Sequence, residues 1–178
     1  MKKTILIPSL ALLCAAVILL GLTFGLQKVA IAKAEAEHLK IMQTLLPGST
    51  EFIREEYTGE DANIRSVHKA DNGYVMETVT AGYAGEITVL VGVSTEGKVT
   101  GLVVRNMSET AGLGLNALND TDFLSQFLNT AGDAEIGTNV DAITGATVTS
   151  KAIARCVNSA VAYVTGADID SGATSWGG

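Results

Sequence analysis

The chain has 178 residues, enough for one domain of ordinary size, and 47% of them are hydrophobic while only 17% are charged. After Lys28 it holds nine basic and 19 acidic residues, a net charge of −10. A surface of that sign argues against nucleic acid or anionic lipid as the main partner, because both are themselves negatively charged.

An uncharged apolar segment runs from Thr4 to Leu26. At about 1.5 Å per residue it would form a helix of roughly 35 Å, long enough to cross a hydrocarbon core of about 30 Å. Residues 1–27 are therefore predicted to be a single transmembrane anchor; a cleaved signal peptide, with its shorter apolar stretch, is the alternative. Lys2 and Lys3 favour a cytoplasmic N-terminus in the cell membrane and an extracytoplasmic body.

The helical pattern continues beyond the apolar segment, which predicts a juxtamembrane helix within residues 28–48 that stops at Leu46, before Pro47 and Gly48. Residues 49–165 form the predicted domain, and the Gly-, Ser- and Asp-rich residues 166–178 a flexible tail. Alternation and β-branched content predict strands at Asn63–His68, Tyr74–Thr80, Glu86–Ser94 and Lys98–Asn106.

One face of the predicted sheet is expected to be buried. Its residues share one parity in each of the last two strands: Ile87, Val89, Val91 and Val93 in one, and Val99, Val103 and Arg105 in the other. Two helices follow, at Asn119–Asn129, with Asn119 or Asp120 as cap and Phe123, Phe127 and Leu128 facing inward, and at Ser150–Val164. Strands followed by helices indicate an α+β fold, with an antiparallel sheet and helices on one side of it.

The segment Asp141–Ser150 is the most informative part of the sequence. It reads as a short extended stretch, a glycine, and then hydroxyl residues at the start of a helix. Helix N-termini present unpaired N–H groups and the positive end of the helix dipole, which favour a phosphate group. The simpler alternative is that Thr147, Thr149 or Ser150 only caps the helix. His38 and His68 lie far apart with no metal-ligand spacing, so no metal site is expected.

The run Asp141, Thr144, Gly145, Ala146 and Thr147 resembles the flavinylation motif Asp-x-x-(Ser/Thr)-Gly-Ala-Thr of the FMN-binding domain family. The resemblance implies that a flavin transferase attaches FMN to Thr147 through a phosphoester. It also implies that the other four residues are recognised by the transferase and lie near the cofactor. Val148 and Thr149, which follow directly, are expected near the cofactor too.

Two glycine-containing segments add to this resemblance. Gly82-Tyr83-Ala84-Gly85 matches the family's Gly-Tyr-x-Gly turn at the start of a hairpin. A second segment is similar to the family's Glu-Thr-Pro-Gly-Leu-Gly loop but has Ala111 in place of proline, and it implies further cofactor contacts from Glu109, Thr110, Gly112, Leu113 and Gly114.

The whole arrangement resembles the family of G subunits of Rnf complexes, which are membrane-bound ferredoxin:NAD oxidoreductases coupled to Na⁺ or H⁺ translocation. The resemblance implies an electron-transfer subunit with covalent FMN, not a stand-alone enzyme. Its partners would be the other membrane subunits, including a second flavinylated one. Alternatives are a flavinylated relay in another extracytoplasmic electron chain or a Na⁺-translocating quinone reductase, and a non-redox sensor or interaction module. A hydrolase using Thr149 or Ser150 lacks a base.

Overall fold

A computed structural model describes residues 30–107 and 120–167. The chain divides into two compact units, with the boundary after Lys40. The first described helix covers residues 30–45 and therefore ends inside the second unit. It ends one residue earlier than predicted, just before Pro47, because the residue that precedes a proline is disfavoured in the helical conformation.

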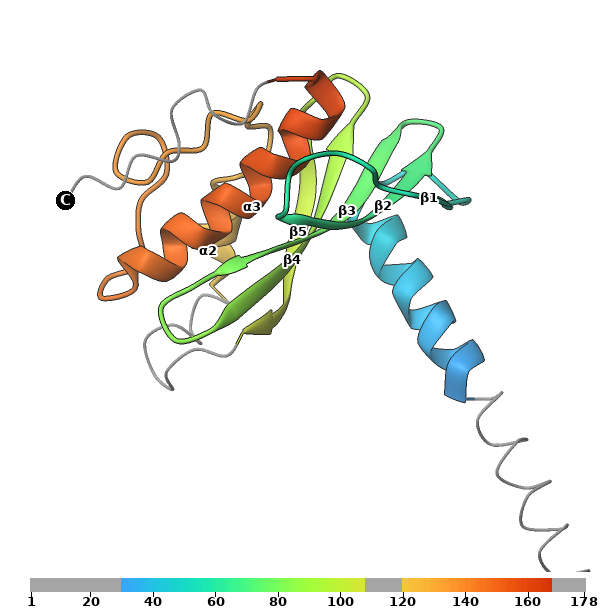
Figure 1. Ribbon diagram of the computed structural model, residues 1–178, viewed down its shortest axis with the longest axis horizontal. Coiled ribbons are helices and arrows are strands. Elements are labelled where there is room, and N and C mark those ends of the chain that lie inside the picture. The colour runs from blue at the N-terminus through green and yellow to red at the C-terminus, as the bar shows by residue number, and fades with distance from the viewer. Residues whose placement is uncertain (1–29, 108–119, 168–178) are drawn as a thin grey trace, which may run out of the picture. The chain divides into compact units, whose positions relative to one another are not determined.

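The second unit is built on a five-stranded antiparallel sheet whose strands follow one another in chain order (Figure 1). The strands are β1 (Ile53–Glu55), β2 (Ile64–Ala70), β3 (Gly73–Ala81), β4 (Glu86–Ser94) and β5 (Val99–Met107). The last four confirm the predicted strands, and β4 has the predicted bounds. Two of the three residues in β1 are charged, so no hydrophobic alternation marked it in the sequence; pairing with β2 defines it.

The longer helix α3 (Thr147–Thr165) lies along one face of the sheet (Figure 1). The apolar residues along one side of α3 are buried, apart from the half-buried Val164. The β4 residues that were predicted to face one side of the sheet are in the same core. This core contains Ile153, Cys156, Val157, Ala160 and Val161 from α3, and Ile87, Val89, Val91 and Val93 from β4. The main core therefore lies between α3 and the sheet.

The predicted parity of β5 is wrong, because the β4–β5 ladder contains two irregularities. Near its start, Val99 pairs with Val93 and Gly101 with Gly92, so that Thr100 is an extra residue. An extra residue moves the side chains that follow it, up to the next irregularity, to the opposite face. Val99 consequently packs in the α3 core, whereas Val103 packs on the other face of the sheet.

That other face is also covered, so the helices do not lie on one side only. Met42, Leu45 and Leu46, from the end of the first helix and the residue after it, form a second core with Val75 and Leu90. The backbone of Leu45 comes so close to the sheet that a Cβ atom on Gly92 would collide with its carbonyl oxygen. Thr100, the extra residue of β5, donates its hydroxyl hydrogen to the same carbonyl at 2.6 Å.

The short helix α2 (Thr121–Ser125) occupies only part of the range predicted for it. Asp120 is its cap, as predicted, and its carboxylate accepts the N–H of Phe123 at 2.9 Å. Phe123 and Phe127 are buried, but Leu128 is 41% exposed, against the prediction. The chain turns back at Asn129, whose φ is +66°, and this turn leaves Leu128 outside the core.

Within residues 30–107 and 120–167, no helix is both long and apolar enough to span a bilayer. The predicted anchor at residues 1–27 lies outside the described residues, as do residues 168–178 of the predicted tail. The expected cofactor contacts Glu109, Thr110, Gly112, Leu113 and Gly114 also lie outside them.

Candidate functional site

The loop before α3 ends in a tight turn that only glycine adopts without strain. The N–H of Ala146 donates to the carbonyl of Ile143 at 2.9 Å, which closes a four-residue turn. Gly145 occupies the third position with φ +78°, the value that a type II turn requires there. The helix starts directly after this turn, so Thr147 is its first residue, three residues earlier than predicted.

Ser150 fastens this loop to the helix. Its hydroxyl donates to the carbonyl of Ala146 at 2.9 Å and accepts the N–H of Ile143 at 3.1 Å. The side chain is fully buried. Ser150 therefore acts as a structural clamp rather than as a nucleophile, and the position of the motif relative to α3 depends on it.

Thr147 is exposed, and no side chain caps the start of α3. The first α3 amide that donates to a backbone carbonyl is that of Ser150, which reaches Ala146 at 2.9 Å. No described residue accepts the N–H groups of Thr147, Val148 or Thr149 through a hydrogen bond. The capping alternative therefore fails for Thr147, and the helix start offers an exposed hydroxyl beside unpaired amides. This arrangement suits a phosphate group.

The remaining motif residues differ in exposure. Asp141, Thr144 and Gly145 are exposed, Ala146 and Thr149 are buried, and Val148 is intermediate. The backbone of Asp141 is held from outside the motif, because its N–H donates to the side-chain carbonyl of Gln126 at 2.7 Å. No role for Gln126 was predicted, and its place in the turn after α2 carries no sequence pattern that would have revealed one.

The direction in which α3 runs along the sheet shows at which end of the sheet the helix starts. Near its end, the Tyr163 ring lies 5.8 Å from that of Tyr74, at the beginning of β3. Farther back, the Cys156 thiol lies beside the side chain of Thr78, in the second half of β3. Helix and strand therefore run in opposite directions, and the Thr147 end of α3 points toward the end of β3.

Three segments that are separate in the sequence lie at this end of the sheet. The Gly82–Gly85 turn joins β3 to β4 there, closed by a hydrogen bond from the Gly82 N–H to the Gly85 carbonyl at 2.7 Å. Met107 at the end of β5 pairs with Ile87 at the start of β4, so the chain leaves β5 at the same end. The start of α3 is the third segment. The structure thus places the glycine turn and the helix start, which carry the predicted motifs, at the same end of the sheet.

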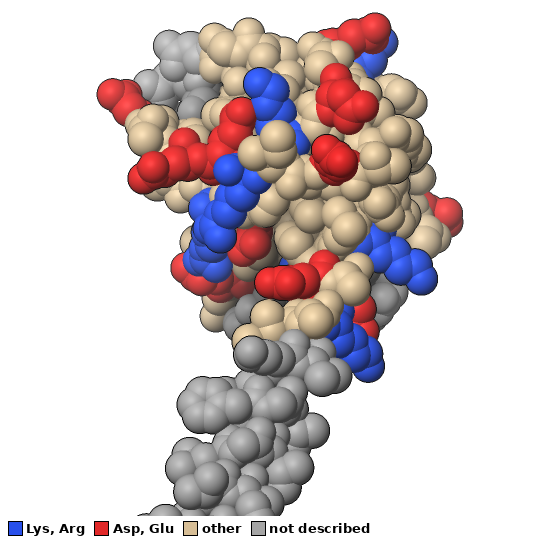
Figure 2. All heavy atoms as spheres, turned by 90° about the vertical axis from the view of Figure 1, so that its right-hand side faces the viewer, with Lys and Arg blue, Asp and Glu red and all other residues tan. Residues whose placement is uncertain are grey.

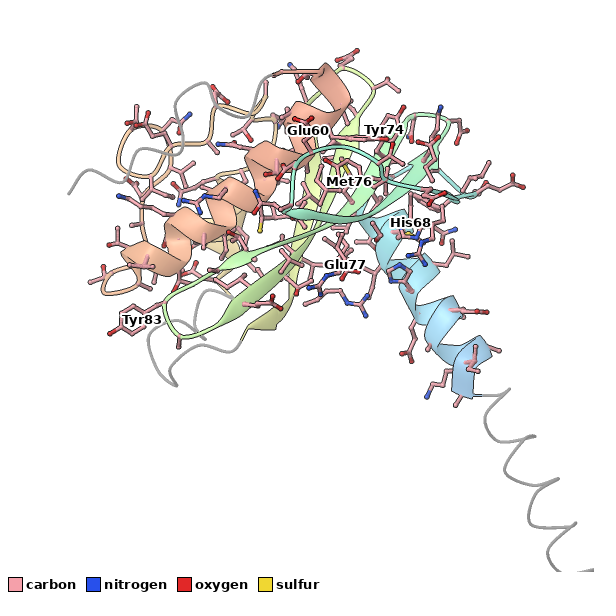
Figure 3. The ribbon with its side chains drawn as sticks, viewed as in Figure 1. Glu60, His68, Tyr74, Met76, Glu77 and Tyr83 are labelled. Carbon is pink, nitrogen blue, oxygen red and sulfur yellow. The ribbon has the colours of Figure 1, made fainter. Side chains whose placement is uncertain are left out.

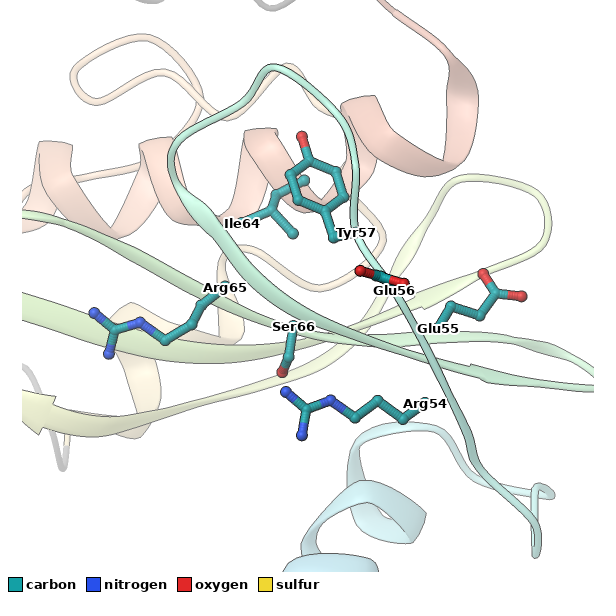
Figure 4. Close-up of a pocket in the computed structure, with 7 residues that line it drawn as sticks. All are labelled: Arg54, Glu55, Glu56, Tyr57, Ile64, Arg65 and Ser66. Carbon is teal, nitrogen blue, oxygen red and sulfur yellow. The ribbon is translucent and has the colours of Figure 1, made fainter.

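Two hollows of about 430 Å³ each open on the described surface. One is shown in Figure 4 and is lined by Arg54, Glu55, Glu56, Tyr57, Ile64, Arg65 and Ser66. Tyr57 contacts Tyr163 near the far end of α3, so this hollow is not part of the site at Thr147. The other hollow borders the end of β3 and is lined by Ala62, Asn63, Ile64, Arg65, Val79, Thr80, Ala81 and Glu86.

Charges on the described surface are mixed. Arg65 lies 3.9 Å from a carboxylate oxygen of Glu77 and 3.6 Å from one of Glu86. On the face drawn in Figure 2, several basic side chains follow one another in a stripe that has acidic side chains beside it.

Cys156, in the middle of α3, is buried and free. Burial raises the pKa of its thiol from 9.0 to about 11, although the Thr78 side chain beside it acts in the opposite direction. The thiol therefore stays protonated at neutral pH and is a core residue rather than a nucleophile.

Comparison with known proteins agrees with this geometry. The family described as FMN-binding domain matches residues 82–162, from the Gly82–Gly85 turn into the last part of α3. The G subunit of the ion-translocating oxidoreductase complex of Methanosarcina acetivorans is 32% identical over 177 residues, which cover 90% of this chain and 93% of that protein.

Two further relatives match over a shorter part. The G subunit of the proton-translocating ferredoxin:NAD(+) oxidoreductase complex of Clostridium ljungdahlii is 40% identical over 99 residues, 52% of this chain and 53% of the relative. The G subunit of the Na(+)-translocating ferredoxin:NAD(+) oxidoreductase complex of Acetobacterium woodii is 39% identical over 98 residues, 50% of this chain and 47% of the relative. The chain thus spans about half the length of these two relatives.

Proposed function

Because the chain belongs to the family of G subunits of ion-translocating oxidoreductase complexes and contains an FMN-binding domain, we propose that it carries electrons on FMN joined to Thr147 by a phosphoester. Its relatives are named as subunits of ferredoxin:NAD(+) oxidoreductase complexes that translocate protons or Na⁺. The chain would serve the same kind of complex as an electron-transfer subunit.

The observation that carries this proposal is the construction of the α3 start. Thr147 combines an exposed hydroxyl with the first position of a helix whose leading amides have no acceptor among the described residues. A phosphate on the Thr147 oxygen would accept hydrogen bonds from those amides and lie at the positive end of the helix dipole. Gly145 and Ala146 keep the approach to Thr147 free of large side chains.

FMN, when bound, supplies the redox chemistry, and the protein supplies position and environment. The clamp from Ser150 and the bond from Asp141 to Gln126 hold the attachment loop at one end of the sheet. A covalent link keeps the cofactor on a domain that faces a compartment with little free FMN. The transferase would recognise Asp141 and Thr144, which are exposed on that loop.

We place the domain outside the cytoplasm, on a single-pass anchor at residues 1–27 with a cytoplasmic N-terminus. The uncharged segment Thr4–Leu26 and the lysines before it support this placement. The partners would be the other membrane subunits of the complex, including a second flavinylated subunit, with a flavin transferase acting during maturation.

The test is to express the full chain with and without a flavin transferase and to measure its intact mass and its flavin fluorescence after denaturing electrophoresis. With the transferase, we expect a mass gain of one FMN less one water and a fluorescent band. Thr147→Ala should lose both signals. Thr121→Ala is the matched control, because Thr121 is likewise exposed and is likewise the first residue of a helix.

Two outcomes would contradict the proposal. Wild-type protein from transferase-containing cells could lack the adduct, which would leave a non-redox module as the better interpretation. Alternatively, Thr147→Ala could keep the adduct, which would move the attachment to another residue.

A further inference from the structure

We propose that the side chain of Tyr83 lies against the ring system of the FMN carried by Thr147 and covers one of its faces. The inference rests on the proposed function, since it needs a flavin on Thr147. It adds a role for the β3–β4 turn beyond the attachment of the cofactor.

Tyr83 is an unusual surface residue. It is 73% exposed, more than any other large hydrophobic side chain among the described residues. It lies in the Gly82–Gly85 turn, which is tied by a hydrogen bond of 2.7 Å and joined to two long, regularly paired strands. The backbone that presents the ring is thus held in place, although the ring itself is mostly open to water.

The dimensions of helix and strand put this turn level with Thr147. Starting from the contact between Cys156 and Thr78, nine residues of α3 lead back to Thr147, a rise of about 13 Å. From Thr78, three residues of β3 lead to its end at Ala81, about 10 Å, and the turn extends farther. The start of α3 and the turn therefore reach about the same distance along the sheet.

The two features also share one side of the molecule. Both β3 and β4 pack against α3, so the turn between them projects from the part of the sheet that α3 covers. Figure 3 shows Tyr83 beyond the end of the two strands, at the left of the view, where α3 also begins. The ribityl chain of FMN separates the phosphate from the ring system, which allows the ring to reach past the helix start toward the turn.

The chemistry of the two rings favours this contact. The flavin ring system is planar and electron-poor, whereas a phenol ring is electron-rich, so an offset stack is attractive beyond the apolar area that it buries. An exposed tyrosine loses little side-chain entropy on stacking, because it has only two rotatable side-chain bonds. Coverage of one face leaves the other face and the edge of the flavin open for electron transfer to a partner.

The experiment compares four full-length chains that carry FMN: wild type, Tyr83→Leu, Tyr83→Phe and Tyr74→Leu. The flavin emission of each chain is divided by the fraction of protein that carries the adduct, as measured by intact mass. Emission is recorded before and after unfolding, and quenching of the emission by iodide is recorded on the folded chain. In the folded wild type we expect weak emission and reduced iodide access. Tyr83→Leu should raise the emission severalfold and the iodide access by a smaller factor, because the second face is already open in the wild type. Tyr83→Phe should raise the emission but keep the low iodide access, because phenylalanine covers the ring without the oxidisable phenol that quenches the flavin.

Tyr74→Leu is the control, because Tyr74 lies at the opposite end of β3 and its loss should leave both signals unchanged. Emission and iodide access equal to wild type in the Tyr83 variants would overturn the inference while the adduct mass still upheld the proposed function. If Tyr83→Leu fails to fold or to accept FMN, the emission and iodide access of Tyr83→Phe alone test the inference. An absent adduct in the wild type would instead defeat the proposed function.

Discussion

The two ends of α3 rest on the same sheet but are completed in different ways. At its C-terminal end the helix is closed: Gly166 takes the left-handed conformation with φ +67°, and Tyr163 packs edge-on against Tyr57 and Tyr74. At its N-terminal end no side chain caps the helix, and the exposed Thr147 is its first residue. One end is built for packing, whereas the other leaves hydrogen-bonding capacity for a group outside the polypeptide.

If the proposed function holds, stability and flavin attachment are separated along one helix. Substitutions at the C-terminal end should change the free energy of unfolding and leave flavin attachment intact. Substitutions at the N-terminal end should reduce the yield of flavin attachment by more than their loss of folding stability accounts for. Four predictions sharpen this comparison, beginning with the largest expected change in stability.

Tyr163→Ala should lower the free energy of unfolding by about 2–4 kcal/mol, because it removes a large half-buried ring and two aromatic contacts. The yield of FMN adduct should stay at the wild-type value under conditions where the variant is folded. Urea unfolding and intact-mass analysis provide the two measurements. Tyr163→Phe keeps the ring and should resemble wild type in both; a parallel loss of adduct in Tyr163→Ala would mean that the two ends are coupled.

Cys156, between the two ends, should make stability sensitive to alkaline pH. Its pKa is raised from 9.0 to about 11 by burial, so the folded state holds the thiol proton more tightly than the unfolded chain does. The resulting stabilisation is complete below pH 9 and is lost as the pH rises toward about 11, by on the order of 2–3 kcal/mol.

The check on Cys156 is to follow urea unfolding across that pH range in wild type and in Cys156→Ala. The variant should be less stable at neutral pH because of lost packing, but its stability should fall less steeply above pH 9. Equal slopes in the two proteins would show that the thiol does not titrate as described.

Ser150→Ala should cost about 1–3 kcal/mol, because it leaves the Ile143 N–H without its acceptor. The attachment loop would lose its tie to α3, so flavin transfer should slow as well. Rates of adduct formation, measured with purified transferase on protein that circular dichroism shows to be folded, test this. Ser159→Ala is a suitable control, since Ser159 is also buried in α3 but contacts Asn63 instead of the loop. A wild-type rate in Ser150→Ala would contradict the role of the clamp.

Gly145→Ala and Gly166→Ala compare the two ends most directly. Both glycines have left-handed backbones, with φ +78° and +67°, so alanine should cost about 1–2 kcal/mol at either position. Only Gly145→Ala is expected to reduce adduct formation, because its turn places Thr147. If Gly166→Ala reduced adduct formation to the same extent, strain alone would explain the effect.

Local patterns determined much of the fold. Alternation and β-branched residues predicted β3, β4 and β5 to within one residue at each end, because a half-buried strand needs that pattern wherever it lies. The pattern failed for β1, which is too short and too charged to alternate, and for the faces of β5. In β5, Thr100 is an extra residue only with respect to the pairing with β4. The periodicity of a single strand gives no information about its pairing partner, so it could not predict this.

The candidate site divides in the same manner. The place of residues 141–147 at a helix start could be predicted from the sequence, because glycine, alanine and hydroxyl residues at that spacing are local features. The ties from Ser150 and Gln126 to the motif, and the position of the Gly82–Gly85 turn at the same end of the sheet, emerged only from the folded chain. These relations depend on the direction in which α3 crosses the strands, and that direction is set by packing between residues far apart in the chain.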